Sequence, residues 1–501
     1  MKTSEKKNRI ILAAYFALVF LFMFIFYTRI HPLIIYDADD WKYICYTRKA
    51  YPIWKEWNPT RILPEVLMPL VAQIGSFVIY PINKDFISAN MIMNALVVGI
   101  AIAVYSYFFY KLIEDKYGLS MAANLSVTTF FLLFHFWIFR SHRKSNEYMF
   151  NGLDLTCFYY YIIPNLLNAS IVMYLCRNDV LKSTKKDVMR RPIKSGVFLL
   201  IIYFALASNL YASIILASFV GCTFLIDLIK GIKEKCATKE LLKRNTIRIA
   251  VLVYWLIIHI FEINGGRAEE LGETKMSPGM IAEQLKSLYE TGGELNKYFA
   301  QYIRILLIAF VICAIIGIKK KKESYKDSLR EIGFITLVGG ITLIYLVLVS
   351  TKHYVGSIRR PDVLYGFIFF LFIDLMIMLL RILKEVRPVQ VILPLMVVIA
   401  FFNINTTKRT FKETNSRNLY YKKCLAIDND IIDQIVTAEE EGRTNIKVYV
   451  PKYRAKSNWP LSNKIGDLAS RALYKHGVLY KKVKVENTVP KRKKNKQFGM
   501  K

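Results

Sequence analysis

Long runs of apolar residues recur along this chain of 501 residues and limit what it can fold into. Each run is roughly 16 to 25 residues long, which is enough for a helix to cross the hydrocarbon core of a bilayer. The first run is Ile10–Ile30, and later ones begin near Phe86, Met121, Thr156, Gly196, Ile214, Ile247, Gln301, Ile332, Val363 and Val389. We therefore predict an α-helical polytopic membrane protein with about eleven transmembrane helices.

The formal net charge of +32 is concentrated between these runs. Cytoplasmic loops of membrane proteins are enriched in Lys and Arg, so the basic N-terminus and the basic loops are predicted to be cytoplasmic. Those loops are Arg177–Lys194, Lys230–Arg248, Lys319–Arg330 and Arg381–Arg387. The placement favours the lipid bilayer as a partner and argues against nucleic acid. Ile10–Ile30 is too long for a signal peptide and lacks a small-residue cleavage site, so we expect an uncleaved anchor in the cell membrane.

One apolar run, Ile62–Tyr80, does not fit this scheme. If it crossed the bilayer, every strongly basic loop after it would lie outside. We expect instead a re-entrant or surface-lying helical pair, buried against protein where Glu65 and Gln73 find partners. Residues 31–85 then form one large first outer loop. Further outer loops are expected at Arg140–Asn151, Asn264–Phe299 and Thr351–Pro361.

The chain changes character after Asn405. Residues 1–404 are predicted to form the membrane domain, and residues 405–501 a polar, extracytoplasmic α/β domain with a basic tail. Leu425–Glu441 and Leu461–Lys475 have helical periodicity, while "NIKVYVP" and "GVLYKKVKV" are typical of strands. An odd number of spans after a cytoplasmic N-terminus places this domain outside the cell.

An acidic cluster begins the first outer loop in "IIYDADDWKYIC". Asp37, Asp39 and Asp40 lie close to the expected membrane boundary and are followed by Trp41, an amphipathic residue suited to an interface. A carboxylate that is partly desolvated but still ionised can act as a general base. The alternative is a solvated, acidic start to a loop.

Polar and basic residues follow at other predicted outer positions. "WNPTRILPE" places Trp57, Arg61 and Glu65 in the first loop, and "GSIRRPD" places Arg359 and Arg360 at the outer end of a span. Paired guanidinium groups suit a phosphate or pyrophosphate clamp, although arginines at a boundary also reach lipid head groups. Arg267 in "INGGRAEE" follows two glycines that would allow close backbone approach to a ligand. A weaker basic candidate comprises Arg140, His142, Arg143 and Lys144.

Metal and cofactor signals are weak. The histidines do not cluster, and His135 and His259 lie within apolar runs, where packing explains them. His31 is close enough in sequence to accompany a cation with Asp37 or Asp39. We predict no cofactor and assign no metal ligands, leaving room for a divalent cation.

The acidic pair with its aromatic neighbour, followed by Trp and Arg in the same loop, resembles GT-C-type membrane glycosyltransferases. It is similar in particular to the bacterial glucosyltransferases that modify O-antigens and to their Gram-positive relatives. The likeness covers residues 10–404 through topology and through "DADDW" and "WNPTR". It implies an inverting hexosyltransferase that uses a polyprenyl-phosphate-linked sugar and an acceptor glycan on the outer face of a bacterial membrane. This chain has "WNPTR" where many relatives have Trp-Asn-Gly-Arg.

The resemblance assigns roles to individual residues. Asp39 and Asp40 match the acidic pair of the first loop, and Arg61 matches the loop arginine. We expect in addition that Asp39 is the general base and that Asp40 holds a sugar hydroxyl or an active-site cation. Asp37 is expected to be the most solvated of the three. The predicted substrate-binding residues are Asp37, Trp41, Trp57, Arg61, Glu65, Arg267, Arg359 and Arg360. The leaving group is already a phosphate, so one base and several cations suffice for the chemistry.

Two other classes of protein remain open. A polysaccharide polymerase or ligase would also use lipid-linked glycans, but it would favour a late arginine-rich outer loop, and Asn264–Phe299 is rich in Glu. A non-enzymatic transporter of lipid-linked glycans would place ionisable residues near the middle of the membrane. Asp227 and Asp374 are the candidates for such a role.

Overall fold

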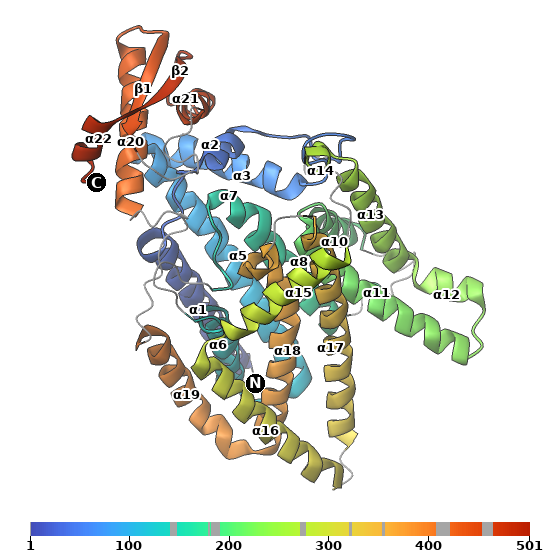
Figure 1. Cartoon of the computed structure of the whole chain (residues 1–501). Coiled ribbons are helices and arrows are strands. Elements are labelled where there is room, and N and C mark those ends of the chain that lie inside the picture. Colours follow the sequence, from blue (N-terminus) through green and yellow to red (C-terminus); the bar gives the residue numbers. More distant parts are fainter. Residues whose placement is uncertain are drawn as a thin grey trace.

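The computed structural model is a helical membrane protein with a small two-stranded sheet at one end (Figure 1). It describes residues 2–140, 148–178, 181, 191–270, 277–319, 323–352, 356–406, 421–452 and 464–500. Within these ranges, nine helical segments are long and apolar enough to cross a membrane, and three shorter apolar helices accompany them. Each of the predicted apolar runs forms one of these helices. How many of them cross the bilayer remains a prediction.

The long segments include α1 (Lys2–Ile25), which continues as the π-helix η1 (Phe26–Ile30), and α5 (Phe86–Tyr117). A third is built from α7 (Leu155–Cys157), η3 (Phe158–Ile162) and α8 (Ile163–Arg177). The others are α11 (Leu210–Lys233), α13 (Thr246–Ile263), α16 (Lys297–Lys319), α17 (Glu323–Ser350) and α18 (Pro361–Glu385). The shorter helices are α6 (Met121–Trp137), α10 (Pro192–Leu206) and α19 (Arg387–Thr406).

The ninth long segment is Ile62–Asn83, made of α3 (Ile62–Ile74), η2 (Gly75–Ile79) and α4 (Tyr80–Asn83). It is one continuous helical segment, so the expected helical pair is wrong. Figure 1 shows α3 lying across one end of the helix bundle. Glu65 is buried with several partners, as expected, but Gln73 is exposed. Eight residues at about 100° each place Gln73 about 80° from Glu65 around the helix, at the edge of the buried side, where its side chain is exposed.

The predicted outer segments meet at one end of the bundle, which we call the loop face. Tyr27 and Tyr36 donate hydrogen bonds to the carbonyls of Phe150 (2.9 Å) and Leu153 (2.7 Å). Near the other end, the α5 residue Asp115 pairs with Arg177, the last residue of α8. α12 (Thr238–Arg244) and the C-terminal end of α16 also lie far from the C-terminal strands in Figure 1.

The C-terminal domain stands beyond the loop face (Figure 1). It contains α20 (Tyr421–Glu440), β1 (Asn445–Pro451), α21 (Ile465–Lys475), β2 (Lys484–Lys491) and α22 (Arg492–Gln497). β1 and β2 are parallel, with Val448 opposite Thr488. The second strand begins later than "GVLYKKVKV" predicted. Gly477 has a φ of +70° and turns the chain, so that the Val478 and Leu479 amides bond back to the Leu473 carbonyl at the end of α21.

Candidate active site

The acidic cluster forms the start of α2 (Ala38–Cys45). Asp37 is the N-cap, and its carboxylate accepts a hydrogen bond from the Asp39 amide at 3.0 Å. Asp40 completes a capping box by accepting from the amides of Tyr36 (3.3 Å) and Asp37 (3.2 Å). These acids therefore occupy the positions where carboxylates stabilise a helix start. This local role explains the spacing of the three aspartates without excluding chemistry.

Asp40 is fully buried and ties α2 to α7. Its Oδ1 accepts from the backbone amide of Thr156 at 2.8 Å and from the Thr156 hydroxyl at 2.7 Å. Burial raises the pKa of Asp40 well above its ordinary value, with further increases from the charges of Asp154 and Asp37. The Thr156 hydrogen bonds oppose that shift. With donors on both oxygens, Asp40 acts as a rigid anchor for the acidic cluster.

Asp154 is a further acid at the same place, which the sequence reasoning missed. It caps α7 by accepting from the Cys157 amide at 2.6 Å. Burial, and then the charge of Asp37, raise the pKa of Asp154 to about 6. A carboxyl group with this pKa can take up and release a proton near neutral pH. We refer to Asp37, Asp39, Asp40 and Asp154 together as the acid cluster.

One side of the acid cluster, which we call the open side, is exposed to solvent, and the other, the closed side, is covered by protein. Asp39 is exposed and Asp37 is half-buried, so it is Asp39, and not Asp37, that is the most solvated of the three predicted acids. Trp41 is fully buried, with its ring stacked on Phe86 at a centroid distance of 5.9 Å. The buried Asp428 of α20 faces the closed side, where burial raises its pKa well above the ordinary value and Trp41 opposes the shift. The C-terminal domain thus covers part of the cluster.

The "WNPTR" loop is held in place by a buried ion pair. Glu65 accepts hydrogen bonds from Arg48 (3.1 Å), Asn58 (2.9 Å) and the Tyr160 hydroxyl (2.7 Å). Arg48 also donates to Glu56 at 2.8 Å and to the backbone carbonyls of Asn58 and Pro59. These contacts define a positioning role for Glu65, whereas substrate binding by Glu65 remains a prediction. Trp57 lies on the same loop and is 42% exposed.

Arg61 emerges from this loop and is buried. Its guanidinium lies 5.2 Å from the centre of the Tyr160 ring, and its Nε is 3.8 Å from a carboxylate oxygen of Glu262. The other Glu262 oxygen accepts a hydrogen bond from the Thr60 hydroxyl at 2.6 Å. Glu262 at the end of α13 therefore orients both the loop and its arginine.

The glycines of "INGGRAEE" bring Arg267 next to Arg61. A Cβ on Gly265 would lie 2.6 Å from Pro59, and the Gly266 amide donates to the Glu56 carbonyl at 3.0 Å. The two glycines, which were expected to allow close approach to a ligand, thus pack against the segment from Glu56 to Pro59 instead. The positive charge of Arg61, and then burial, lower the pKa of Arg267. Two like charges held together in this way favour an anion between them.

Arg360 is held on the loop face by a carboxylate and an aromatic ring. It forms a two-pronged ion pair with Asp362, at 3.0 Å from Nε and 2.5 Å from Nη2. Its guanidinium lies 4.8 Å from the centre of the Tyr161 ring and 3.4 Å from the sulfur of Cys157. Arg359 instead points to the surface, where it pairs with Glu290 at 3.1 Å between half-exposed side chains. The two adjacent arginines therefore have different environments.

One short segment joins the acids to the cations. Cys157 receives the Arg360 contact on its sulfur, while its amide donates to Asp154. The next turn carries Tyr161, which is close enough to interact electrostatically with both Arg360 and Arg61. We call Arg61, Arg267 and Arg360 the arginine cluster. The predicted acids and these arginines are thus brought to one face by η3 and its flanking turns.

A separate apolar groove of about 430 Å³ begins close to the arginine cluster. It is lined by side chains of α3, α5, α8 and α10, including Leu63 and Leu67 in the first turns of α3, which begins after Arg61. Ile100 and Val104 on its wall are 46% and 44% exposed, so the groove opens on the apolar outer surface of the bundle. Such a groove suits a hydrocarbon chain entering from the membrane.

Several other candidates lie away from this site or outside the described residues. His31 is fully buried among Phe26, Tyr27, Tyr148 and Phe158, and burial lowers its pKa to about 3, so it does not accompany the acids. Arg140 pairs with Glu294 at 2.8 Å. His142, Arg143 and Lys144 lie outside the described residues. Within the described ranges, no group of three or more His, Cys, Asp or Glu is arranged to hold a metal ion.

No family model, curated protein or solved structure matches this chain. Its site therefore has to be interpreted from its own geometry. Arg48, Asp154, Thr156, Glu262 and Asp362 belong to it and were missed by the sequence reasoning. Asp154 and Thr156 could have been found as an Asp two residues before Thr at the start of an apolar run, which is a helix-capping signal. The partners of Arg48 and Glu262 have no comparable sequence signal.

Proposed function

We propose that this protein is a membrane glycosyltransferase that transfers a hexose from a polyprenyl-phosphate carrier to an exported or cell-surface glycan. The observation that carries the proposal is the position of the acid cluster and the arginine cluster on one face, joined through Asp154, Cys157 and Arg360. Transfer from a lipid phosphate requires a base for the acceptor hydroxyl and cations for the departing phosphate. Both requirements have candidates within this one site.

Asp39 is the proposed general base. It is the exposed member of the acid cluster, so an acceptor hydroxyl can approach it. Its carboxylate would take the hydroxyl proton while the oxygen attacks the anomeric carbon and the bond to the carrier phosphate breaks. Asp154 is a second candidate, favoured by its pKa of about 6 and by its place between the other acids and Arg360.

The arginine cluster is proposed to hold the donor phosphate. Arg61 and Arg267 bear like charges in a partly buried setting, and the only carboxylate that pairs with either among the described residues is Glu262. An anionic phosphate would relieve their repulsion through charge-assisted hydrogen bonds. The apolar groove that begins at Leu63 supports a carrier with a hydrocarbon tail, because the head group and tail would then bind next to each other.

The proposal includes an orientation in the membrane. The basic loops of the sequence favour a cytoplasmic position for the end opposite the loop face. The loop face and the C-terminal domain would then lie outside the cell, where an exported glycan is available. A bacterial cell membrane follows from the sequence resemblance alone.

The polymerase or ligase and the transporter remain alternative functions, and each would depend on different residues. A polymerase or ligase would transfer a whole glycan, for which the loop face also has a base and cations. A transporter would need ionisable groups acting deep in the bundle. Asp227 is partnered by Arg244 and Asn245, each within 2.9 Å, and Asp374 accepts from Thr336 at 2.8 Å, which favours packing roles for both.

Reconstitution tests the proposal directly. Purified protein would be supplied with polyprenyl-phosphate hexose and with surface glycan isolated from cells that lack the protein. We expect hexose to be added to the glycan, detected by mass spectrometry, and little addition by Asp39→Asn protein. In cells, loss of a side-chain hexose on deletion supports transfer. Shortened glycan chains would favour a polymerase, and accumulation of lipid-linked glycan inside the cell a transporter.

A further inference from the structure

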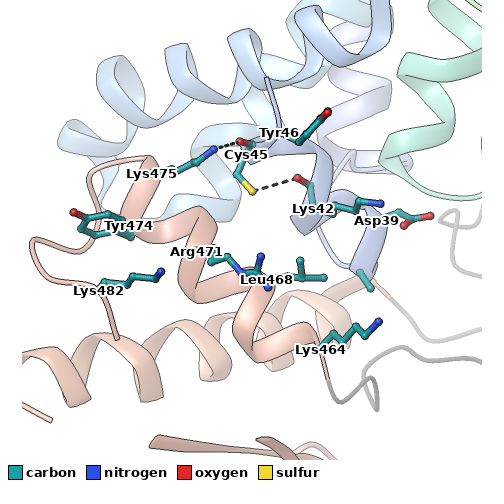
Figure 2. Close-up of a pocket in the computed structure, with 11 residues that line it drawn as sticks. Asp39, Lys42, Cys45, Tyr46, Lys464, Leu468, Arg471, Tyr474, Lys475 and Lys482 are labelled. Carbon is teal, nitrogen blue, oxygen red and sulfur yellow. Dashed lines mark hydrogen bonds between the residues drawn. The ribbon is translucent and has the colours of Figure 1, made fainter. Parts of the chain in front are cut away.

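A second cavity, of about 710 Å³, lies between α2 and α21, where the C-terminal domain meets the loop face (Figure 2). Its lining contains five cations, Lys42, Lys464, Arg471, Lys475 and Lys482, but the single acid Asp39. The domain contact itself is well defined, because Lys475 donates to the Cys45 carbonyl at 2.7 Å and His476 to the Ile44 carbonyl at 3.1 Å. The cavity thus lies at a domain interface that is held by defined hydrogen bonds.

The positive charge of this cavity is only partly compensated. Arg471 pairs with Asp467 on the same helix, and Lys475 is used by the domain contact. Among the described residues, the ammonium groups of Lys42 and Lys482 form no ion pair. Clustered, unpaired cations in a concave site attract an anion and are well suited to phosphate.

The remaining lining is apolar or aromatic. Tyr46 and Tyr474 contribute rings, Leu468 contributes a side chain, and the lysines contribute their methylene stems. Apolar faces of sugars pack on such surfaces, while hydroxyl and phosphate groups reach the polar tips. The volume is within the range of roughly 300–1,000 Å³ that is typical of ligand sites. The lining therefore fits a ligand that combines sugar rings with negative charge.

We infer that this cavity binds a phosphate-bearing segment of the acceptor glycan. The inference rests on the proposed transferase activity and adds that the acceptor is anionic. Asp39, the proposed base, lines the cavity at its α2 side, so a glycan held there would present a neighbouring hydroxyl to the acid cluster (Figure 2). The C-terminal domain would then be the acceptor-binding part of the protein. A lipid head group is less suitable, since the domain stands beyond the helix bundle (Figure 1).

Binding can be measured without any transfer step. Full-length protein in nanodiscs of zwitterionic phosphatidylcholine would be titrated by calorimetry with phosphorylated maltotriose, and separately with maltotriose. The test variant is Lys42→Gln/Lys482→Gln. The control variant is Lys447→Gln/Lys484→Gln, which removes the same charge from exposed strand positions of the C-terminal domain that do not line the cavity. Thermal melting of each variant checks that its fold is intact.

We expect the phosphorylated sugar to bind more tightly than the neutral one, and increasing salt to weaken that binding. The test variant should bind the phosphorylated sugar roughly tenfold more weakly than wild type, because charge-assisted contacts are lost. The control variant should bind as wild type. Equal affinities of the test and control variants would overturn the inference.

Two further outcomes separate the inference from its alternatives. In the first, the phosphorylated sugar fails to bind, while the melting temperatures of the test variant and wild type differ in nanodiscs containing phosphatidylglycerol. In that case the ligand is a lipid head group, and the glycan assignment is wrong. If the phosphorylated sugar binds in the cavity but no variant or wild-type protein transfers hexose, the cavity assignment stands and the proposed transferase function fails.

Discussion

Thr156 donates two hydrogen bonds to one oxygen of Asp40, from its amide at 2.8 Å and from its hydroxyl at 2.7 Å. The two residues are 116 positions apart, and their contact joins the start of α2 to the start of α7. It holds Asp40 as an anchor and leaves Asp39 exposed. The members of the predicted catalytic pair are therefore expected to respond differently to mutation.

Asp40→Asn should destabilise the protein. The amide nitrogen of Asn would face backbone donors that now point at a carboxylate oxygen, leaving a buried donor unsatisfied at a cost of about 1–3 kcal/mol. Thr156→Val, which removes only the hydroxyl bond, should cost about 1 kcal/mol. Thermal melting in detergent measures both. Asp39→Asn is the matched control, because its exposed side chain should leave the melting temperature unchanged.

Asp39→Asn should instead reduce transfer. Removing a general base lowers the rate by about two to four orders of magnitude, while donor binding should be nearly intact. Asp37→Asn should cost far less, because Asp37 serves as an N-cap that Asn can also provide. Initial rates of hexose transfer by the purified variants test both expectations. A rate within a few-fold of wild type for Asp39→Asn, together with a large loss for Asp154→Asn, would transfer the role of base to Asp154.

The pKa of Asp154 predicts a distinct pH dependence of stability. Because burial and Asp37 raise this pKa to about 6, the folded protein binds the proton more tightly than the unfolded chain does. The free energy of unfolding contributed by this group is therefore largest below pH 4 and falls as the pH rises to about 6. Asp154→Asn should remove that fall. Melting temperatures of both proteins between pH 4 and 7 check it, and parallel curves would contradict the prediction.

Substitutions of the neighbouring residues Arg359 and Arg360 should have different effects on donor affinity and stability. Arg360→Ala removes a buried ion pair partner of Asp362, and we expect donor affinity to fall roughly ten- to a hundredfold, with some loss of stability. Arg360→Lys should rescue only partly, because a single ammonium cannot copy the two-pronged contact. Arg359→Ala removes a surface pair worth about 0–1 kcal/mol and should change stability little. Donor titrations with each variant provide the comparison, and equal effects at both positions would contradict it.

Arg267→Gln should weaken donor binding without weakening the fold. The like charge of Arg61 opposes the charge of Arg267, so removing it should leave the melting temperature unchanged or slightly higher. Donor affinity should fall roughly tenfold through loss of a charge-assisted contact. A clear drop in melting temperature would show that Arg267 serves the fold and not an anion.

The orientation can be tested by labelling with a membrane-impermeant thiol reagent in a cysteine-free background. Tyr480→Cys is a suitable site in the C-terminal domain, because the Tyr480 side chain is 91% exposed. It should react in intact cells. Lys239→Cys, in α12, should react only after permeabilisation. The reverse pattern would place the acid and arginine clusters in the cytoplasm.

The sequence by itself determined the helices and their order. Apolar runs long enough to span a bilayer must satisfy their backbone hydrogen bonds internally, and each of the eleven predicted runs is a helix. The polar C-terminal segment forms the predicted α/β unit. The N-cap role of Asp37 was not predicted, although it depends on the same kind of local chemistry, since Asp is a preferred N-cap. These properties depend on residues that are neighbours in the chain.

Only the tertiary structure decided which polar residues meet. Asp154 joins Asp37 across more than a hundred residues, Arg267 meets Arg61 because Gly265 allows close packing on Pro59, and Lys42 and Lys482 line one cavity from the two sides of a domain contact. Apolar periodicity carries no information on such pairs, because it fixes which side of a helix is buried but not which helix lies opposite. The separate environments of Arg359 and Arg360 were hidden for the same reason.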